Sequence, residues 1–121
     1  AVTADVEKMF YGFKVREDHR NYLRFLWYRD NNPDEEVIDY WMTVHVFGNS
    51  PSPAVATYGL RKAAEHGELE HGTDAKQFVF RNFYVDDALT SLATHNRAID
   101  LLQRTRALLA ESNLKLHKIA S

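Results

Sequence analysis

Three aspartates are the side chains of this sequence best suited to act together in chemistry. Asp86 and Asp87 are adjacent where a strand is expected to reverse, and Asp5 ends a short apolar strand near the beginning of the chain. Carboxylates that lie close together repel one another unless a cation is bound between them. Their hard oxygen ligands favour Mg²⁺ or Mn²⁺ over zinc. Two such ions, about 3.5–4 Å apart, form the arrangement that supports in-line phosphoryl displacement.

The adjacent pair is informative because of its setting. Asp is a favoured turn residue, so two aspartates in a turn are weak evidence for a site. Residues 78–85 before them are almost wholly apolar and aromatic and alternate in the manner of a strand. We predict a central strand there, which would place both carboxylates in a tight turn at the end of a rigid element. Asp5 alone could equally be a turn or cap residue.

A second cluster of titratable side chains lies in Glu65–His71, which combines two histidines with three carboxylates. His66, Glu70 and His71 could bind a metal at the surface, but zinc sites need rigid spacing and a fixed surrounding shell. The segment spans an expected helix end and a glycine, so we interpret it as a solvated loop with adventitious metal binding at most. The other histidines are scattered and indicate no site: His19, His45, His95 and His117.

Hydrophobic periodicity predicts the elements that position these residues. Alternation predicts a strand over residues 1–6 and a hairpin over residues 22–46, with a turn at 30–34. Ser52-Pro53 predicts the start of a helix, capped by the serine, that Gly67 ends near His66. Residues 68–77 are expected to form an exposed loop.

The second half of the chain predicts a hairpin, a helix and a closing strand. The hairpin strands are residues 78–85 and 88–92, and the closing strand is residues 114–119. Thr94 is expected to cap the helix and Asn113 to follow its end. The expected core stripe of this helix is Ala98, Leu101, Leu102, Leu108 and Leu109. Strands with two helices predict an α+β fold, an antiparallel sheet with two helices packed on one face and the other face left for function.

Composition limits the class of protein. The 121 residues, with a net charge of −2, are enough for one domain, residues 1–121. The absence of cysteine excludes a disulfide scaffold, a thiolate metal site and a cysteine nucleophile. No apolar run approaches the roughly 18 residues of a membrane span. The chain begins without Met and inside a strand, so we expect it to be a fragment of a longer polypeptide.

Several segments, in order, resemble the polymerase motifs of reverse transcriptases. These are Ala4–Phe10, Met42–Gly48 with Ser52-Pro53, and Arg81–Asp87. With Phe25–Trp27 and Leu116–Lys118 included, the sequence resembles the BEL/Pao class of long-terminal-repeat retrotransposons. The resemblance covers essentially the whole chain. It implies a polymerase palm, with an RNA-recognition or ferredoxin-like topology, that performs RNA-directed DNA synthesis by two-metal nucleotidyl transfer.

The resemblance also implies roles for individual residues. Asp5, Asp86 and Asp87 would hold two Mg²⁺ or Mn²⁺ ions, and Val6 would add its backbone carbonyl to the nucleotide-bound metal. Lys118 would donate a proton to the departing pyrophosphate. The residues implied to contact the nucleotide or template are Phe10, Phe47, Gly48, Ser52, Pro53 and Tyr84. Among them, Phe10 would exclude a 2′-hydroxyl and so select deoxynucleotides.

The implied partners are an RNA or DNA template with a DNA primer, and deoxynucleoside triphosphates. The resemblance also implies fingers, a thumb and a ribonuclease H domain in the parent polyprotein, within an intracellular retroelement particle. Pro51 and Asn113 depart from the pattern of the family. Two alternatives stay open: a catalytically inactive RNA-recognition-like module whose aromatics stack bases, and a decayed retroelement remnant. The isolated fragment is expected to have little or no activity.

Overall fold

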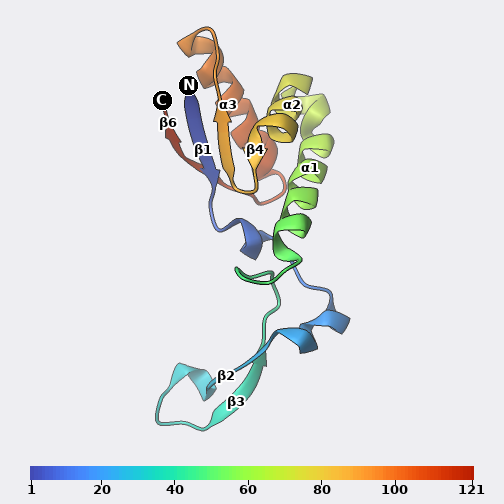
Figure 1. The fold of residues 1–121 in the computed structure, drawn as a ribbon, viewed down its shortest axis with the longest axis vertical. Coiled ribbons are helices and arrows are strands. Elements are labelled where there is room, and N and C mark those ends of the chain that lie inside the picture. Colours follow the sequence, from blue (N-terminus) through green and yellow to red (C-terminus); the bar gives the residue numbers. More distant parts are fainter.

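The computed structural model describes residues 1–121 and contains a four-stranded antiparallel sheet. Its strands are β1 (Val2–Val6), β4 (Phe83–Tyr84), β5 (Asp87–Thr90) and β6 (Leu116–Ala120). Their order across the sheet is β4-β5-β1-β6, and every neighbouring pair is antiparallel. β1 therefore lies between β5, which begins at the second of the two adjacent aspartates, and the last strand of the chain (Figure 1).

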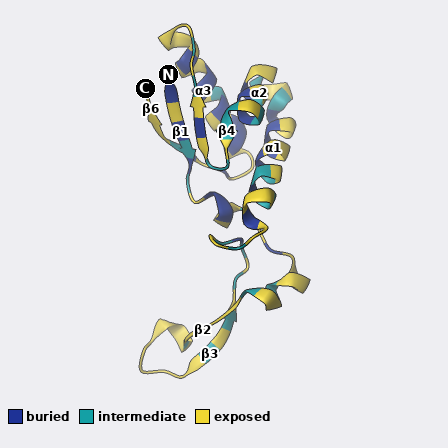
Figure 2. Cartoon of the chain, in the orientation of Figure 1, coloured by how far each residue is buried: buried dark blue, intermediate teal, exposed yellow.

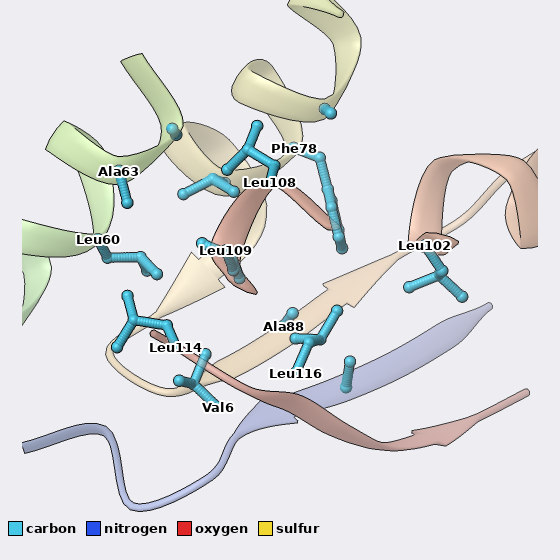
Figure 3. Close-up of a cluster of buried hydrophobic side chains, with 14 of the residues drawn as sticks. Val6, Leu60, Ala63, Phe78, Ala88, Leu102, Leu108, Leu109, Leu114 and Leu116 are labelled. Atoms are coloured by element: carbon cyan, nitrogen blue, oxygen red, sulfur yellow. The ribbon is translucent and has the colours of Figure 1, made fainter. Parts of the chain in front are cut away.

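Three helices cover one face of this sheet: α1 (Ser52–His71), α2 (Thr73–Asn82) and α3 (His95–Ala110). The alternate residues Val2, Ala4 and Val6 of β1 are buried, as a strand with one covered face requires. Side chains of the helices and the sheet meet in a single apolar cluster (Figure 3). The predicted α+β fold, with the helices packed on one face of an antiparallel sheet, is confirmed, with three helices in place of two.

The last helix and its flanks follow the sequence prediction closely. Thr94 caps α3, because its side-chain oxygen accepts a hydrogen bond from the backbone N–H of Arg97 at 3.3 Å. Asn113 has a φ of 59°, the left-handed conformation that it was expected to take after the helix. All five residues of the predicted core stripe are buried: Ala98, Leu101, Leu102, Leu108 and Leu109.

The predicted strand over residues 78–85 is wrong for most of its length. Residues 73–82 form α2, and only Phe83–Tyr84 are extended, in an edge strand rather than a central one. Ala75, Phe78 and Val79 are the buried side chains of α2, at helical spacings of three and four. The aromatic run favoured a strand, but its packing against α1 and α3 decides the conformation.

The first helix is longer than predicted. α1 continues through Gly67 to His71, and Gly72, with a φ of 98°, follows its end. Gly67 is buried because α3 passes close to it: a Cβ at this position would lie 2.6 Å from Cγ of Leu108. The expected loop over residues 68–77 is therefore the end of α1 and the start of α2. No helix of the structure combines the length and the apolar character needed to cross a membrane.

A separate two-stranded sheet projects from this body (Figure 1). β2 (Arg24–Tyr28) pairs antiparallel with β3 (Val37–Trp41), inside the predicted range of residues 22–46. Short 3₁₀ turns lie next to β2 at Glu17–Leu23 and Arg29–Asn31, and another, Met9–Gly12, follows β1 and places Met9 and Phe10 in the core of the body. Most of the hairpin is exposed, in contrast to the buried interior of the body (Figure 2).

Candidate functional site

The structure brings the first and last members of the acidic triad together. The register of β1 against β5 pairs Asp5 directly with Asp87. Because Ala4 and Val6 are buried beneath the helices, Asp5 lies on the open face of the sheet. Directly opposed residues in an antiparallel pair have Cβ atoms about 4.5–5.5 Å apart. A cation between β1 and β5 could therefore contact both carboxylates.

Asp86 lies in the turn beside this pair. Tyr84 pairs with Asp87, which leaves Val85 and Asp86 as the two central residues of a tight hairpin turn. The carbonyl of Asp86 accepts a hydrogen bond of 2.8 Å from the N–H of Val6, so the turn is attached to the end of β1. Val6 is buried, at 1% exposed, and the metal contact of its backbone carbonyl stays a prediction.

The turn contains a strained residue. Val85 has a φ of 56°, a region that β-branched residues rarely occupy, because their Cβ crowds the backbone. Backbone strain of this kind persists where the surrounding structure enforces it, and such residues cluster at functional sites. Here the β4–β5 pairing and the hydrogen bond from Val6 enforce it on both sides of Val85.

The triad differs from neighbouring carboxylates in its charge balance. Asp5, Asp86 and Asp87 form no ion pair with any lysine or arginine. Among the three, only Asp5 contacts a basic side chain, the imidazole of His117. Glu7, two residues beyond Asp5, is instead bonded to Lys115 at 2.8 Å, and this contact lowers the pKa of Glu7. Asp5 and Asp87, on adjacent strands, supply the carboxylate oxygens that hard divalent ions such as Mg²⁺ or Mn²⁺ prefer. The three aspartates do not converge as closely as Glu70, His71 and Glu111, whose ligand atoms lie within 4.8 Å of one another.

His117 is a residue of the site that sequence reasoning missed. Its Nε2 lies 2.6 Å from Oδ1 of Asp5, and the β1–β6 register places the two residues opposite each other. The signal was present in the alternation of the last strand: Leu116 points into the core, so its neighbour faces the open side with Asp5. The pairing of the last strand with the first could not be deduced from the sequence.

Lys118 follows His117 in a distorted part of the strand. The β1–β6 register shifts between Thr3 and Asp5, and Lys118 has a φ of 49°. Its side chain is exposed and makes no ion pair with the aspartates. The proton-donor role of Lys118 stays a prediction.

The residues predicted to hold the nucleotide include an aromatic pair. The rings of Phe10 and Phe47 have centroids 4.7 Å apart. Phe10 is 6% exposed, whereas Phe47 is 65% exposed, so the aromatic surface that an incoming sugar could reach belongs mainly to Phe47. Gly48 follows with a φ of 81°, a left-handed conformation that favours glycine. Tyr84 is also highly exposed, on the edge strand opposite Asp87.

Ser52 does not cap α1, contrary to the prediction. It is the first residue of the helix, with Pro51 in the capping position, and its side chain makes no cap hydrogen bond. Its Oγ instead lies 3.2 Å from Nδ1 of the buried His45 and joins the helix to the preceding segment. Ser52 is completely buried while Pro53 is exposed, so in this structure Pro53 is the more accessible of the two to a nucleotide or template.

The predicted surface cluster is rearranged by the fold. Glu70 and His71 at the end of α1 meet Glu111 beyond α3, with ligand atoms within 4.8 Å of one another, and His66 is not part of the group. His71 Nε2 lies 2.6 Å from Glu111 Oε1, a contact that lowers the pKa of Glu111. This contact joins the end of α1 to the end of α3, and we interpret it as a structural contact between the two helices.

Comparison with known proteins adds no family assignment. No protein-family model matches the sequence, and no curated protein is significantly similar to it.

Proposed function

We propose that this chain is a reverse transcriptase palm, which adds deoxynucleotides to the 3′ end of a primer by two-metal nucleotidyl transfer. The observation that carries the proposal is the direct pairing of Asp5 with Asp87, with Asp86 in the adjoining turn. Asp5 lies near the start of the sequence and the other two aspartates lie about 80 residues later, and their carboxylates have no lysine or arginine partner. The resemblance of the ordered segments to reverse transcriptase motifs is the reason for interpreting this pairing of aspartates as a polymerase metal site.

Asp5, Asp86, Asp87 and the carbonyl of Val6 would hold two Mg²⁺ or Mn²⁺ ions, which when bound activate the primer hydroxyl and stabilise the leaving oxygens. The chain itself would orient the nucleotide. Phe47, backed by Phe10, offers an aromatic surface against the sugar. Lys118 is the proposed proton donor to pyrophosphate. The partners would be an RNA or DNA template with a DNA primer and deoxynucleoside triphosphates.

The remaining parts of the proposal concern the parent protein. Fingers, a thumb and ribonuclease H in a longer polyprotein, and an intracellular retroelement particle, are implied by the resemblance alone. The fingers and the thumb would bind the template and primer, which the palm needs for synthesis.

A nucleic-acid-binding module without catalysis is the second candidate function. It is favoured by the exposed Tyr84 on an open sheet backed by helices, the arrangement with which RNA-recognition domains stack bases. Three carboxylates without a lysine or arginine partner near that aromatic ring would repel phosphate, which favours the metal-dependent polymerase. A decayed remnant would have no reason to retain the three aspartates together.

Thermal unfolding with and without Mn²⁺ tests the metal centre. At ten times its dissociation constant, a bound ion stabilises the folded state by about 1.4 kcal/mol, which raises the Tm of a chain of this size by about 5 °C. We expect this increase for the wild-type chain and its near loss for Asp86→Asn. Asp34→Asn, in the exposed hairpin, is the matched control and should keep the full increase. An Asp86→Asn variant that responds as the wild type does would contradict the site.

A further inference from the structure

Asp5 is flanked on both sides by side chains of the open face. The β1–β5 register places Asp87 opposite it, and the β1–β6 register places His117 opposite it on the other side. Directly opposed residues project from the same face of a sheet. Asp5 therefore lies between a carboxylate that shares its charge and an imidazole that can donate a hydrogen bond.

The contact with His117 has a defined direction. Nε2 of His117 lies 2.6 Å from Oδ1 of Asp5, and because a carboxylate only accepts, Nε2 must carry the proton. This hydrogen bond occupies Nε2 and Oδ1 and leaves Oδ2 of Asp5 free for a metal ion. The side chains are 26% and 24% exposed, so the hydrogen bond is partly shielded from water.

The backbone on both sides of His117 holds it in this place. Leu116 is buried in the core opposite Val6, which turns the next residue toward the open face. On the other side, the register shift and the positive φ of Lys118 form a bulge. Bulges redirect side chains and are common beside active sites.

We propose that His117 is a positioning residue of the metal centre: its Nε2–H fixes the carboxylate of Asp5 so that Oδ2 faces the ions. This inference rests on the proposed function, because it requires Asp5 to be a metal ligand. Asp5 makes no other side-chain hydrogen bond, so nothing in the structure replaces His117. Loss of a partner that orients a ligand typically weakens metal affinity by about 10–100-fold.

The test is a Mn²⁺ titration of the 121-residue chain, with free Mn²⁺ measured by electron paramagnetic resonance. His117→Phe removes the donor, and we expect its Kd for Mn²⁺ to rise about 10-fold or more. In His117→Gln the side-chain amide can still donate to Oδ1, and its Kd should stay within about 3-fold of the wild type. His66→Phe, the same change at an exposed histidine, should leave the Kd unaltered.

Two further variants separate this inference from the proposed function. Asp86→Asn should abolish the binding, and His117→Thr, too short to reach Asp5, repeats the test if His117→Phe does not fold. Melting temperatures without metal show that each variant is folded. Equal Kd values for the wild type and the donor-free variants, with binding still dependent on Asp86, overturn the positioning role alone. Binding that survives Asp86→Asn overturns both the metal centre and the role of His117.

Discussion

At the scale of single residues, the three aspartates of the candidate site have no arginine or lysine partner, whereas Glu7, two residues beyond Asp5, is paired with Lys115. Carboxylates of the hairpin, Asp30, Asp34 and Glu35, also lack such a partner, so the feature particular to the site is the pairing of Asp5 with Asp87 across β1 and β5. The sequence predicted the aspartates because alternation placed Asp5 at the end of a strand and Asp86-Asp87 at a reversal. It did not predict His117, because its role depends on which strands become neighbours, and that is decided by packing of the whole chain.

Thr105 gives a prediction about stability at the same scale. Its side chain is completely buried in α3, and its hydroxyl is the one buried side-chain polar atom without a hydrogen-bond partner. Thr105→Val keeps the shape and removes the unsatisfied group, so we expect the free energy of unfolding to rise by about 1 kcal/mol. Chemical denaturation measures this change.

Thr94→Val is the matched control for that prediction. Here the hydroxyl oxygen caps α3, and its removal should lower the free energy of unfolding by about 1 kcal/mol. A Thr105→Val variant that is destabilised to the same extent would show that the hydroxyl of Thr105 has a partner in solution.

At the scale of elements, the main error of the sequence prediction was to place a loop and a strand where the chain forms α2. The run from Phe78 to Val85 contains aromatic and β-branched residues that favour strands, and alternation supported that interpretation. The competing signal was the helical spacing of Ala75, Phe78 and Val79, which begins before the aromatic run. The predicted end of α1 near Gly67 was wrong for a related reason. A glycine can mark either a helix end or a close approach of two helices, and only the position of Leu108 in the fold distinguishes the two.

The junction of the three helices depends on Arg104. This α3 residue bonds the carboxylate of Asp74 in α2 at 2.5 and 2.7 Å, Asp100 at 2.6 Å, and the carbonyl of His71 at the end of α1 at 2.9 Å. The paired hydrogen bonds hold the pKa of Asp74 down at about 2, against an ordinary value of 3.8. A depressed carboxyl pKa stabilises the fold above the unfolded-state value, and this stabilisation is lost as the pH falls from about 4 through 2.

Asp74→Asn should therefore change the acid limb of the stability curve. We expect a loss of no more than about 1 kcal/mol at pH 7, because the side chain of Asp74 is 61% exposed. Between pH 4 and pH 2 the melting temperature of the variant should fall less steeply than that of the wild type. Melting curves at half-unit pH steps, with Asp34→Asn as a control, measure the difference. Parallel curves for wild type and Asp74→Asn would exclude this ion pair as a source of acid sensitivity.

At the scale of the whole molecule, the body and the hairpin differ in character. The hairpin of β2 and β3 carries two arginines against five carboxylates and has several exposed apolar side chains, Phe25, Leu26, Trp27, Val37 and Trp41. Isolated two-stranded hairpins are marginally stable in water. The stacking of Phe25 on Tyr40 across the strands, with centroids 5.7 Å apart, is one of the contacts that stabilise this hairpin. An acidic projection of this kind does not favour contact with nucleic acid phosphates.

The molecule alone is therefore expected to be a poor polymerase. Primer extension by the 121 residues should be slower by about 100-fold or more than by a chain that also carries fingers and a thumb, because misplaced reactants lose that much rate. Both rates should depend on Asp86. Robust, processive synthesis by the 121 residues would contradict the need for further domains.

The central claim is that Asp5, Asp86 and Asp87 share bound divalent ions, and paramagnetic broadening by Mn²⁺ in two-dimensional amide NMR spectra tests it most directly. Substoichiometric Mn²⁺ should first broaden the signals of the β4–β5 turn, the end of β1 and His117, and excess Mg²⁺ should restore them. Broadening centred on Glu70, His71 and Glu111 instead, with the aspartate signals unchanged, would contradict the account.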